Sequence, residues 1–310
     1  MDLRVQLGPL ALKNPVLVAS GTFGYGREFA PHLDLSELGG IMVKGVSTVP
    51  WAGNAGVRVA ETASGMLNAI GLQNPGLEHF LNVDLPWLRQ FDTAIIVNVV
   101  GHTPGEYEEV SRRVSEAGGA SALELNVSCP NIEGGLAFGT DVRGLSGLVR
   151  LVRRTTELPL FVKLSPNVTD PVPFARAAVE EGADGLSLIN TVLGLAIDVK
   201  GRRPVLGRRV GGLSGPAVKP IALRFIYEVR CALDVPVIGM GGVQNARDAL
   251  EFLMAGADAV AVGTALFKDP WAAVKIIGEI GSVLREEGFR GPRDASGAAL
   301  PGREVPHERT

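Results

Sequence analysis

Eight short apolar runs, each bounded by turn-forming residues, limit what this chain can fold into more than any other feature. Buried strands of a parallel sheet have this pattern because both of their faces are covered. Most of the segments between the runs carry apolar residues at three- and four-residue spacing, which is typical of amphipathic helices. The runs are Val16–Ala19, Ile41–Lys44, Ile95–Val99, Ala122–Val127, Leu160–Leu164, Gly185–Ile189, Pro236–Met240 and Ala259–Val262. The helical segments are Leu77–Gln90, Gly105–Ala117, Gly144–Thr156, Pro171–Glu181, Pro216–Leu233 and Ala246–Ala255.

Alternation of strands and helices predicts a parallel sheet with right-handed crossovers. Eight such units favour a closed (β/α)8 TIM barrel, and a doubly wound open sheet is the competing architecture. The chain of 310 residues is a usual length for one barrel domain, which we place at residues 1–288. Residues 289–310 are rich in Gly, Pro, Arg and Glu, and we expect a poorly ordered tail there. The connections Gly45–Pro75 and Asn190–Gly215 are long for turns, and such loops are usually functional.

Composition argues against several classes of protein. The formal net charge is −3, and no basic stripe indicates a nucleic-acid partner. No apolar stretch is long enough for a membrane span, and the start of the chain lacks a signal-peptide pattern. The two cysteines lie far apart in the sequence, which fits a reducing compartment and excludes an iron–sulfur cluster held by this chain alone. With four histidines and no pair at ligand spacing, no metal site is expected. We expect a cytoplasmic protein.

Polar or glycine residues follow every apolar run, at the end where a barrel of this kind carries its active site. Asparagine amides suit the polar edges of a planar heterocycle, and the lysines supply positive charge. Glycine pairs after the seventh and eighth strands are where barrels commonly bind phosphate. A planar cofactor with a phosphate is therefore expected, and FMN fits. The strand-end residues are Ser20, Gly21, Lys44, Gly45, Asn98, Asn126, Lys163, Asn190, Thr191, Gly241, Gly242, Gly263 and Thr264.

The two cysteines receive different interpretations. Cys129 lies in the segment Ser128–Asn131, just past the fourth run and next to Asn126. Nearby lysines would lower the pKa of a thiol there and favour the thiolate, so we assign Cys129 a catalytic role. Cys231 falls within the helical pattern Pro216–Leu233, where a lone cysteine is usually a small packing residue. The segment Gly239–Gln244 begins like a dinucleotide fingerprint but lacks its last glycine, so a Rossmann site is weakly supported.

At these same positions the sequence resembles the class 1B dihydroorotate dehydrogenases, and the resemblance runs from the N-terminus to about residue 285. Glu61–Gly76 is similar to the substrate loop of that class. The other matching motifs are Asn126–Asn131, Val162–Asn167, Ile189–Thr191, Gly211–Pro216, Gly239–Gly242 and Val262–Thr264. Together these motifs are far more specific than an isolated glycine pattern.

The resemblance implies a TIM barrel that holds FMN at the carboxyl ends of its strands. Cys129 would be the base that removes a proton from dihydroorotate while hydride leaves for the flavin. The FMN contacts implied are Ser20, Lys44, Gly45, Asn98, Asn126, Lys163, Ile189, Gly215, Gly241, Gly242, Gly263 and Thr264. The pyrimidine contacts implied are Lys44, Asn68, Ala69, Ile70, Gly71, Leu72, Asn126, Asn190 and Thr191.

Class 1B members pass electrons to NAD through a partner subunit with FAD and an iron–sulfur cluster. The resemblance therefore implies a homodimer of this chain with two such partners, in de novo pyrimidine synthesis. A cysteine at position 129 favours class 1 over class 2, whose members use serine there. A class 1A-like enzyme that uses fumarate and a dihydropyrimidine dehydrogenase-like flavin barrel are the alternatives. Two alternatives belong to other classes of protein. A non-redox phosphate-binding barrel would be a colourless protein. A purely structural barrel would leave the Lys, Asn and Cys residues unexplained.

Overall fold

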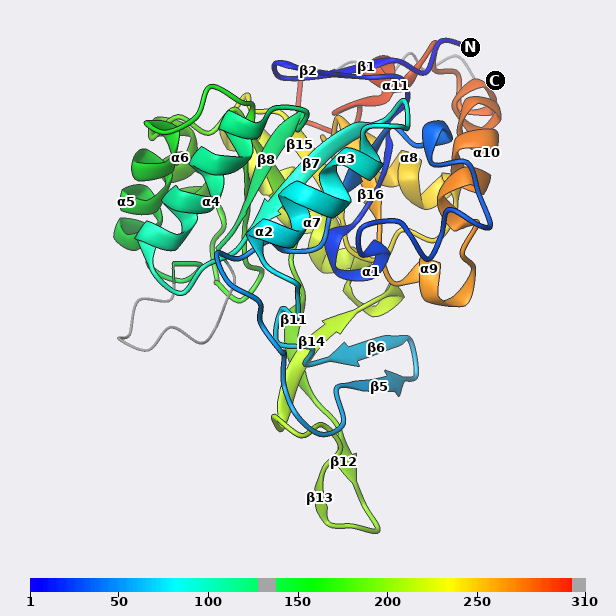
Figure 1. Ribbon diagram of the computed structural model, residues 1–310. Helices are drawn as coiled ribbons and strands as arrows, with labels where there is room; N and C mark the ends of the chain where they lie inside the picture. Colours follow the sequence, from blue (N-terminus) through cyan, green and yellow to red (C-terminus); the bar gives the residue numbers. More distant parts are fainter. Residues whose placement is uncertain (128–137, 303–310) are drawn as a thin grey trace.

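The computed structural model describes residues 1–127 and 138–302, and it contains the predicted closed barrel of eight parallel strands (Figure 1). The strands pair around the barrel in chain order, and the pairing of the last strand, β16, with the first, β3, closes it. The (β/α)8 prediction is confirmed, and a doubly wound open sheet is excluded. The barrel strands are β3 (Val16–Val18), β4 (Gly40–Met42), β7 (Ala94–Val99), β8 (Ala122–Asn126), β9 (Leu160–Lys163), β10 (Gly185–Leu188), β15 (Val237–Met240) and β16 (Ala259–Val262).

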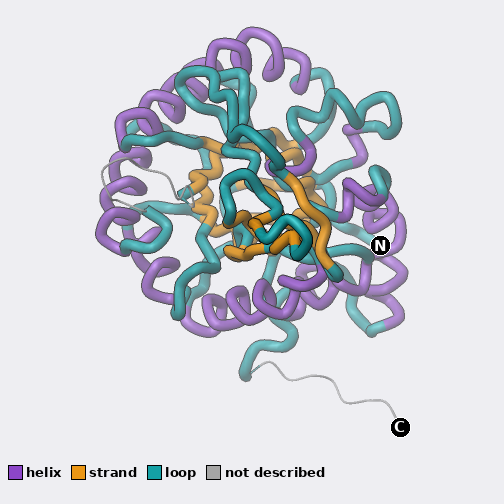
Figure 2. Tube along the Cα trace, turned by 90° about the horizontal axis from the view of Figure 1, so that it is seen from below, coloured by secondary structure: helices purple, strands orange, loops and turns teal. Residues whose placement is uncertain are grey.

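A ring of helices covers the outside of the barrel, as Figure 2 shows along the barrel axis. Thr103 and Asp141 accept hydrogen bonds from backbone N–H groups of α4 and α5, which satisfies donors at the helix starts. The main helices are α4 (Pro104–Ala117), α5 (Val142–Arg153), α6 (Val172–Glu180), α7 (Lys219–Ala232), α8 (Ala246–Met254) and α10 (Ala272–Glu286). Helix α10 was not among the helices predicted from the sequence. Shorter helical pieces are α1 (Ser20–Phe23), η1 (Leu35–Glu37), α2 (Leu77–His79), the π-helix η2 (Phe80–Asp84), α3 (Leu85–Leu88), η3 (Pro216–Val218) and α9 (Ala265–Lys268).

The core has two layers, which follow from the alternation of side chains along each strand. One layer lies between barrel and helices and includes Val97, Leu123 and Leu125. The other fills the barrel interior and includes Ile96 and Phe161. The antiparallel strands β1 (Val5–Leu7) and β2 (Leu10–Leu12) contribute to this inner layer, on the side of the barrel opposite the cap described next (Figure 1).

The two long connections form a second sheet beside the barrel opening. It comprises β5 (Val59–Thr62), β6 (Gly65–Asn68), β11 (Val192–Leu195) and β14 (Val210–Ser214), in the order β11-β14-β6-β5. We call it the cap sheet. Figures 1 and 2 show it projecting from one end of the barrel, across the barrel axis. A hairpin of β12 (Ile197–Asp198) and β13 (Arg203–Pro204) extends farther out.

The described residues after position 288 correct the expectation of a poorly ordered tail. Helix α11 (Pro292–Ala295) forms there, and Ala295 is fully buried. The backbone N–H groups of Gly297 and Ala299 donate to carbonyls at the end of α8, and the hydroxyl of Ser296 donates to Asp258 at 3.1 Å. Small residues allow this close packing. The same residues, judged by composition alone, predict a disordered segment. Residues 303–310 lie outside the described part of the chain.

Candidate active site

A cavity of about 1070 Å³ lies between the carboxyl ends of the barrel strands and the cap sheet. Small-molecule sites commonly have volumes of about 300–1,000 Å³, so the cavity has room for a large cofactor with a small substrate. Every predicted cofactor and substrate residue in the described chain lines it. From barrel strand ends and following loops come Ser20, Lys44, Gly45, Asn98, Asn126, Lys163, Ile189, Asn190, Thr191, Gly241, Gly242, Gly263 and Thr264. From the two long connections come Asn68, Ala69, Ile70, Gly71, Leu72 and Gly215.

Three asparagines form a chain of hydrogen-bonded amides at the cavity floor. In the barrel, Asn126 is in register with Lys163 on the next strand. The Asn126 amide donates to Asn98 Oδ1 at 3.4 Å, and the Asn190 amide donates to Asn126 Oδ1 at 3.1 Å. The phenol of Tyr107 on α4 donates to the Asn126 carbonyl at 2.7 Å, which fixes the backbone at this strand end. The amides are therefore held in defined orientations before any ligand binds.

Two lysines bring positive charge to the same cavity. Lys163 is only 6% exposed, and neither Lys163 nor Lys44 has an ion-pair partner within the described ranges. Burial lowers the pKa of Lys44 below its usual value, and the positive charges of Arg58 and Lys163 lower it further. Buried unpaired ammonium groups are costly, so the arrangement favours a negatively charged ligand.

Glycines after β15 and β16 bring the backbone close to the cavity. Gly242 has a φ of +96°, and a Cβ atom there would lie 2.8 Å from the Lys219 Cβ. At Gly263 the nearest atom to such a Cβ is the Ala19 Cβ at 3.7 Å, so this glycine has open space beside it. Backbone exposed in this way can approach a phosphate group closely. Together with the unpaired lysines and the amide chain, these glycines fit a planar cofactor that carries a phosphate.

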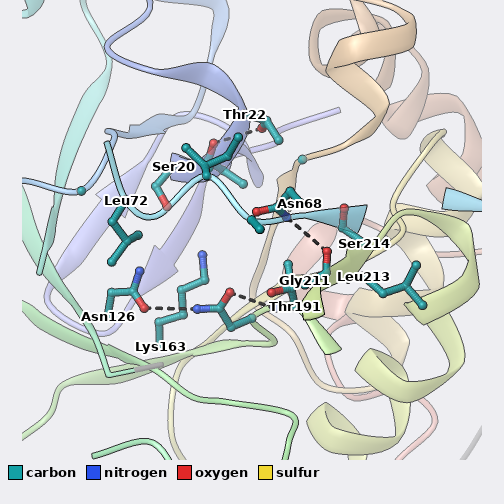
Figure 3. A pocket seen from close by; sticks show the side chains of 18 of the residues that line it. Ser20, Thr22, Asn68, Leu72, Asn126, Lys163, Thr191, Gly211, Leu213 and Ser214 are labelled. Carbon is teal, nitrogen blue, oxygen red and sulfur yellow. Dashed lines mark hydrogen bonds between the residues drawn. The ribbon is translucent and has the colours of Figure 1, made fainter. Parts of the chain in front are cut away.

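The cap sheet adds polar groups opposite the barrel end. The amide of Asn68 on β6 donates to the Gly212 carbonyl on β14 at 3.2 Å. Ser214 on β14 is linked to Thr264 after β16 through a hydroxyl–hydroxyl distance of 2.8 Å. Figure 3 shows Asn126, Lys163 and Thr191 near one another, with Asn68 and Ser214 on the cap strands beside them. The cavity is therefore bounded by two separately formed structures.

Several cavity residues were not assigned by the sequence analysis. Asn167 bonds to Ser165 and to the Thr191 carbonyl, at 3.1 and 3.2 Å, so it supports the predicted residue Thr191. The Trp51 and His102 rings stack with centroids 4.1 Å apart, and this stack joins the loop before β5 to the loop after β7. Asn167 belongs to a motif that carried the resemblance, which is a usable signal. Trp51 and His102 have no such signal, because they meet only in three dimensions.

Of the two cysteines, only Cys231 lies within the described residues. Cys129, the predicted base, lies in the segment 128–137, outside the described residues. Cys231 lies on α7, as its helical pattern predicts, but it is exposed and is not a buried packing residue.

Comparisons with known proteins agree on one family. The family model described as Dihydroorotate dehydrogenase matches residues 2–284. The chain belongs to the dihydroorotate dehydrogenase family. It is 56% identical over 288 residues to the protein named "Dihydroorotate dehydrogenase B (NAD(+)), catalytic subunit" of Geobacillus sp. (strain WCH70), covering 93% of this chain and 92% of that one. It is 51% identical to the protein of the same name from Bacillus pumilus (strain SAFR-032), covering 99% of each chain.

Membership in the dihydroorotate dehydrogenase family confirms that the chain is an oxidoreductase. The names of its relatives support class 1B, as the sequence predicted, and do not favour the class 1A and dihydropyrimidine dehydrogenase-like alternatives. Enzymes of this family depend on a flavin. The names of these relatives specify a catalytic subunit, which implies that those proteins work with a separate partner subunit. Within residues 1–127 and 138–302, no helix is both long and apolar enough to cross a membrane. The same residues contain no group of three or more potential metal ligands among His, Cys, Asp and Glu.

Proposed function

We propose that this chain oxidises dihydroorotate to orotate, with FMN as its cofactor, and passes the electrons to NAD through a partner subunit. The observation that carries the proposal is a single cavity with oriented amides, unpaired lysines and exposed glycine backbone, beneath a cap that supplies Asn68. Family membership supports the same reaction.

The cofactor would be held by the barrel end. Gly241, Gly242, Gly263 and Thr264 would surround the phosphate with backbone and hydroxyl groups, and Ser20, Gly45, Ile189 and Gly215 would line the rest. When bound, FMN supplies at N5 the acceptor for the hydride that leaves C6 of the substrate. Lys163 would place its buried positive charge near the flavin ring, where it favours the additional negative charge that reduction brings.

The substrate would be oriented by Asn68, Asn126 and Asn190, whose amides pair with the polar edges of the pyrimidine. Lys44 would face the substrate carboxylate and the flavin together. Ala69, Ile70, Gly71, Leu72 and Thr191 would complete the pocket. Cys129, as thiolate, would remove the proton from C5 as hydride leaves C6, so that one proton and one hydride are lost. Positioned bases of this kind contribute about 10²–10⁴ in rate.

The test is anaerobic addition of dihydroorotate to the purified yellow protein, with dihydrouracil as the matched control. Rapid bleaching of the flavin by dihydroorotate alone is expected, because Lys44 and Asn68 suit a carboxylate that dihydrouracil lacks. Equal bleaching by dihydrouracil would instead favour a dihydropyrimidine dehydrogenase-like enzyme. Heat release of the cofactor and chromatography should yield FMN, and recovery of FAD would contradict the proposal.

The partner proposal has its own test. The isolated chain should reduce artificial acceptors with dihydroorotate but reduce NAD negligibly. Addition of an iron–sulfur and FAD-containing subunit should restore NAD reduction and shift the elution volume toward two catalytic and two partner chains. Robust turnover with fumarate by the isolated chain would support the class 1A alternative, and NAD reduction without a partner would also contradict the proposal.

A further inference from the structure

Glu124 is a buried carboxylate inside the barrel that the mechanism above does not use. It lies on β8 between Ala122, which belongs to the inner core layer, and Asn126. Its neighbours Leu123 and Leu125 face the outer layer, so alternation directs Glu124 inward. The side chain is fully buried, and its Oε1 has no hydrogen-bond partner among the described residues.

Such a carboxylate is a poor device for stability alone. Burying a charged group with an unsatisfied oxygen costs free energy of folding. Replacement of buried charge by an apolar side chain of similar volume is often neutral or stabilising. A position in the barrel interior that retains a carboxylate therefore calls for a role other than filling space.

The remaining oxygen of Glu124 supplies that role. Glu124 is in register with Asn98 on β7, and its Oε2 accepts a hydrogen bond from the Asn98 amide at 2.5 Å. Asn98 Oδ1 accepts from Asn126, and Asn126 Oδ1 accepts from Asn190. Asn190 Oδ1 in turn accepts from the backbone N–H of Thr191 at 2.8 Å. The chain of amides therefore runs without a break from a carboxylate to a backbone N–H.

Both ends of this chain impose the same direction. A carboxylate only accepts hydrogen bonds, and a backbone N–H only donates. Every amide between them must turn its NH₂ group toward Glu124 and its carbonyl toward Thr191. An amide turned the other way would bring two donors or two acceptors together.

We propose that Glu124 is a positioning residue that sets the direction of the Asn98–Asn126–Asn190 amide chain and thereby the donor and acceptor pattern presented to the pyrimidine. The inference rests on the proposed function, because it takes the pyrimidine to bind at these amides. Glu124 does not contact the ligand itself and acts through Asn98.

The test is Glu124→Met, which preserves approximate volume and removes the acceptor. Orotate affinity, measured by calorimetry on protein saturated with FMN, should fall about tenfold, while Tm stays equal or rises. Loss of affinity with equal or higher stability is a signature that a merely structural residue would not give. Orotate binding within twofold of the wild-type value would overturn the proposal.

Asp84→Asn is the matched control, because Asp84 is also a buried carboxylate but pairs with Arg27 at 3.0 Å and, among the described residues, makes no hydrogen bond to the amide chain. This substitution should lower Tm and leave orotate affinity unchanged. If it weakened orotate binding as much as Glu124→Met, the effect would be general and the proposal would fail.

A second pair of substitutions, which exchanges the carboxylate and the amide between positions 124 and 98, tests the proposal if Glu124→Met does not fold. Asn98→Asp places two carboxylates together and should weaken orotate binding more than tenfold. Adding Glu124→Gln restores a donor facing an acceptor and should return the affinity to within threefold of the wild-type value. Absence of this rescue would overturn the proposal. A wild-type protein that binds flavin but no orotate would instead contradict the proposed function.

Discussion

The barrel end and the cap sheet face each other across one cavity, but they are built differently. The barrel strands are buried along nearly their whole length, with Ala94 at the start of β7 half-buried, and β8 has no exposed residue. In the cap sheet, β5 and β11 alternate between half-buried and exposed residues, and Leu193 and Leu195 on β11 are more than half exposed. Strands β6 and β14 are mostly half-buried. The barrel is therefore held by its core, whereas the cap is held by its own strand pairing and by a few polar contacts such as Ser214 to Thr264.

This difference indicates that the barrel and the cap have different roles in binding cofactor and substrate. Groups that must hold fixed positions, such as Asn98, Asn126 and Lys163, lie on rigid strands. Asn68, which is predicted to contact the pyrimidine and not the flavin, lies on the cap, whose smaller buried area allows local opening at low cost. Substrate entry and release would then occur by movement of the cap, while the cofactor stays bound to the barrel.

The largest effect is expected on the chemical step. Cys129→Ala should retain FMN and reduce the rate of flavin bleaching by dihydroorotate at least 100-fold, since a base contributes about 10²–10⁴. Cys129→Ser should recover partly at high pH, because an alcohol is a weaker acid than a thiol. Stopped-flow absorbance measures both, and Cys231→Ala on the exposed side of α7 is the control. Near-normal bleaching by Cys129→Ala would remove this residue as the base.

Lys44 gives the next largest effect and a pH dependence. Lys44→Met should weaken orotate binding by about 1.5–3 kcal/mol, the range for hydrogen bonds to charged groups. In the wild type, affinity should fall as pH rises through the lowered pKa of Lys44, because the neutral amine no longer attracts the carboxylate. The variant should lose this trend. Titration of orotate between neutral and alkaline pH measures both, and an identical pH trend in the variant would exclude Lys44 as its source.

The same pKa predicts the sign of a stability effect in the absence of ligands. Because the folded-state pKa of Lys44 is below its unfolded value, the unfolded chain binds more protons between these two values. The free energy of unfolding from this group therefore rises with pH across that window. Denaturant titrations of wild type and Lys44→Met should converge as pH rises, and a constant difference would contradict the assignment.

A pair of amide variants separates the cap from the barrel. Asn68→Ala and Asn126→Ala should each weaken orotate binding by about 1–3 kcal/mol, because polar groups of the ring lose a partner. Only Asn126→Ala should also weaken FMN binding, since Asn68 is predicted to contact the substrate alone. Cofactor retention after dialysis and titration with orotate measure the two effects. Loss of FMN from Asn68→Ala would contradict the proposal that the barrel holds the cofactor while Asn68 on the cap contacts only the substrate.

The smallest effect is expected at the contact between cap and barrel. Ser214→Ala removes the hydroxyl pair with Thr264. It should weaken the attachment of the cap to the barrel by about 0.5–1.5 kcal/mol, the usual net value of one hydrogen bond. If the cap moves to admit substrate, the substitution should raise the rate of orotate release a few-fold and leave Tm nearly unchanged. Stopped-flow displacement of orotate measures the release rate, and an unchanged rate would show that this contact does not restrain the cap.

The barrel could be predicted from sequence because each strand carries its own signal. Runs such as Ala122–Val127 are apolar enough to be buried on both faces, and polar residues at their ends mark the cavity. The cap could not be predicted in the same way. Strands β5 and β6 pair locally, but β6 also pairs with β14, which lies more than a hundred residues later in the chain. The sequence indicated only that two connections were long, and their pairing depends on contacts that local patterns do not encode.

The site residues likewise divide into those that local sequence motifs reveal and those that only three-dimensional contacts reveal. Asn126, Lys163 and Asn68 belong to recognisable motifs, so the sequence could place them at one site. Glu124 has no such signal, because in the sequence it is only a polar residue within an apolar strand. Its role depends on a hydrogen bond with Asn98 on the neighbouring strand β7. Helix α11 was missed because its packing uses small residues, such as Ala295, that carry no periodic pattern.

We infer that the substrate lies between amides fixed by the barrel and a group supplied by the cap. A crystal structure of the flavin-loaded protein with orotate would decide this. We expect one orotate in the cavity, with its polar edges on Asn126 and Asn190 from the barrel and on Asn68 from the cap, and its carboxylate near Lys44. Orotate bound elsewhere, or held in the cavity by barrel groups with Asn68 turned away, would show that the cap does not take part in substrate binding.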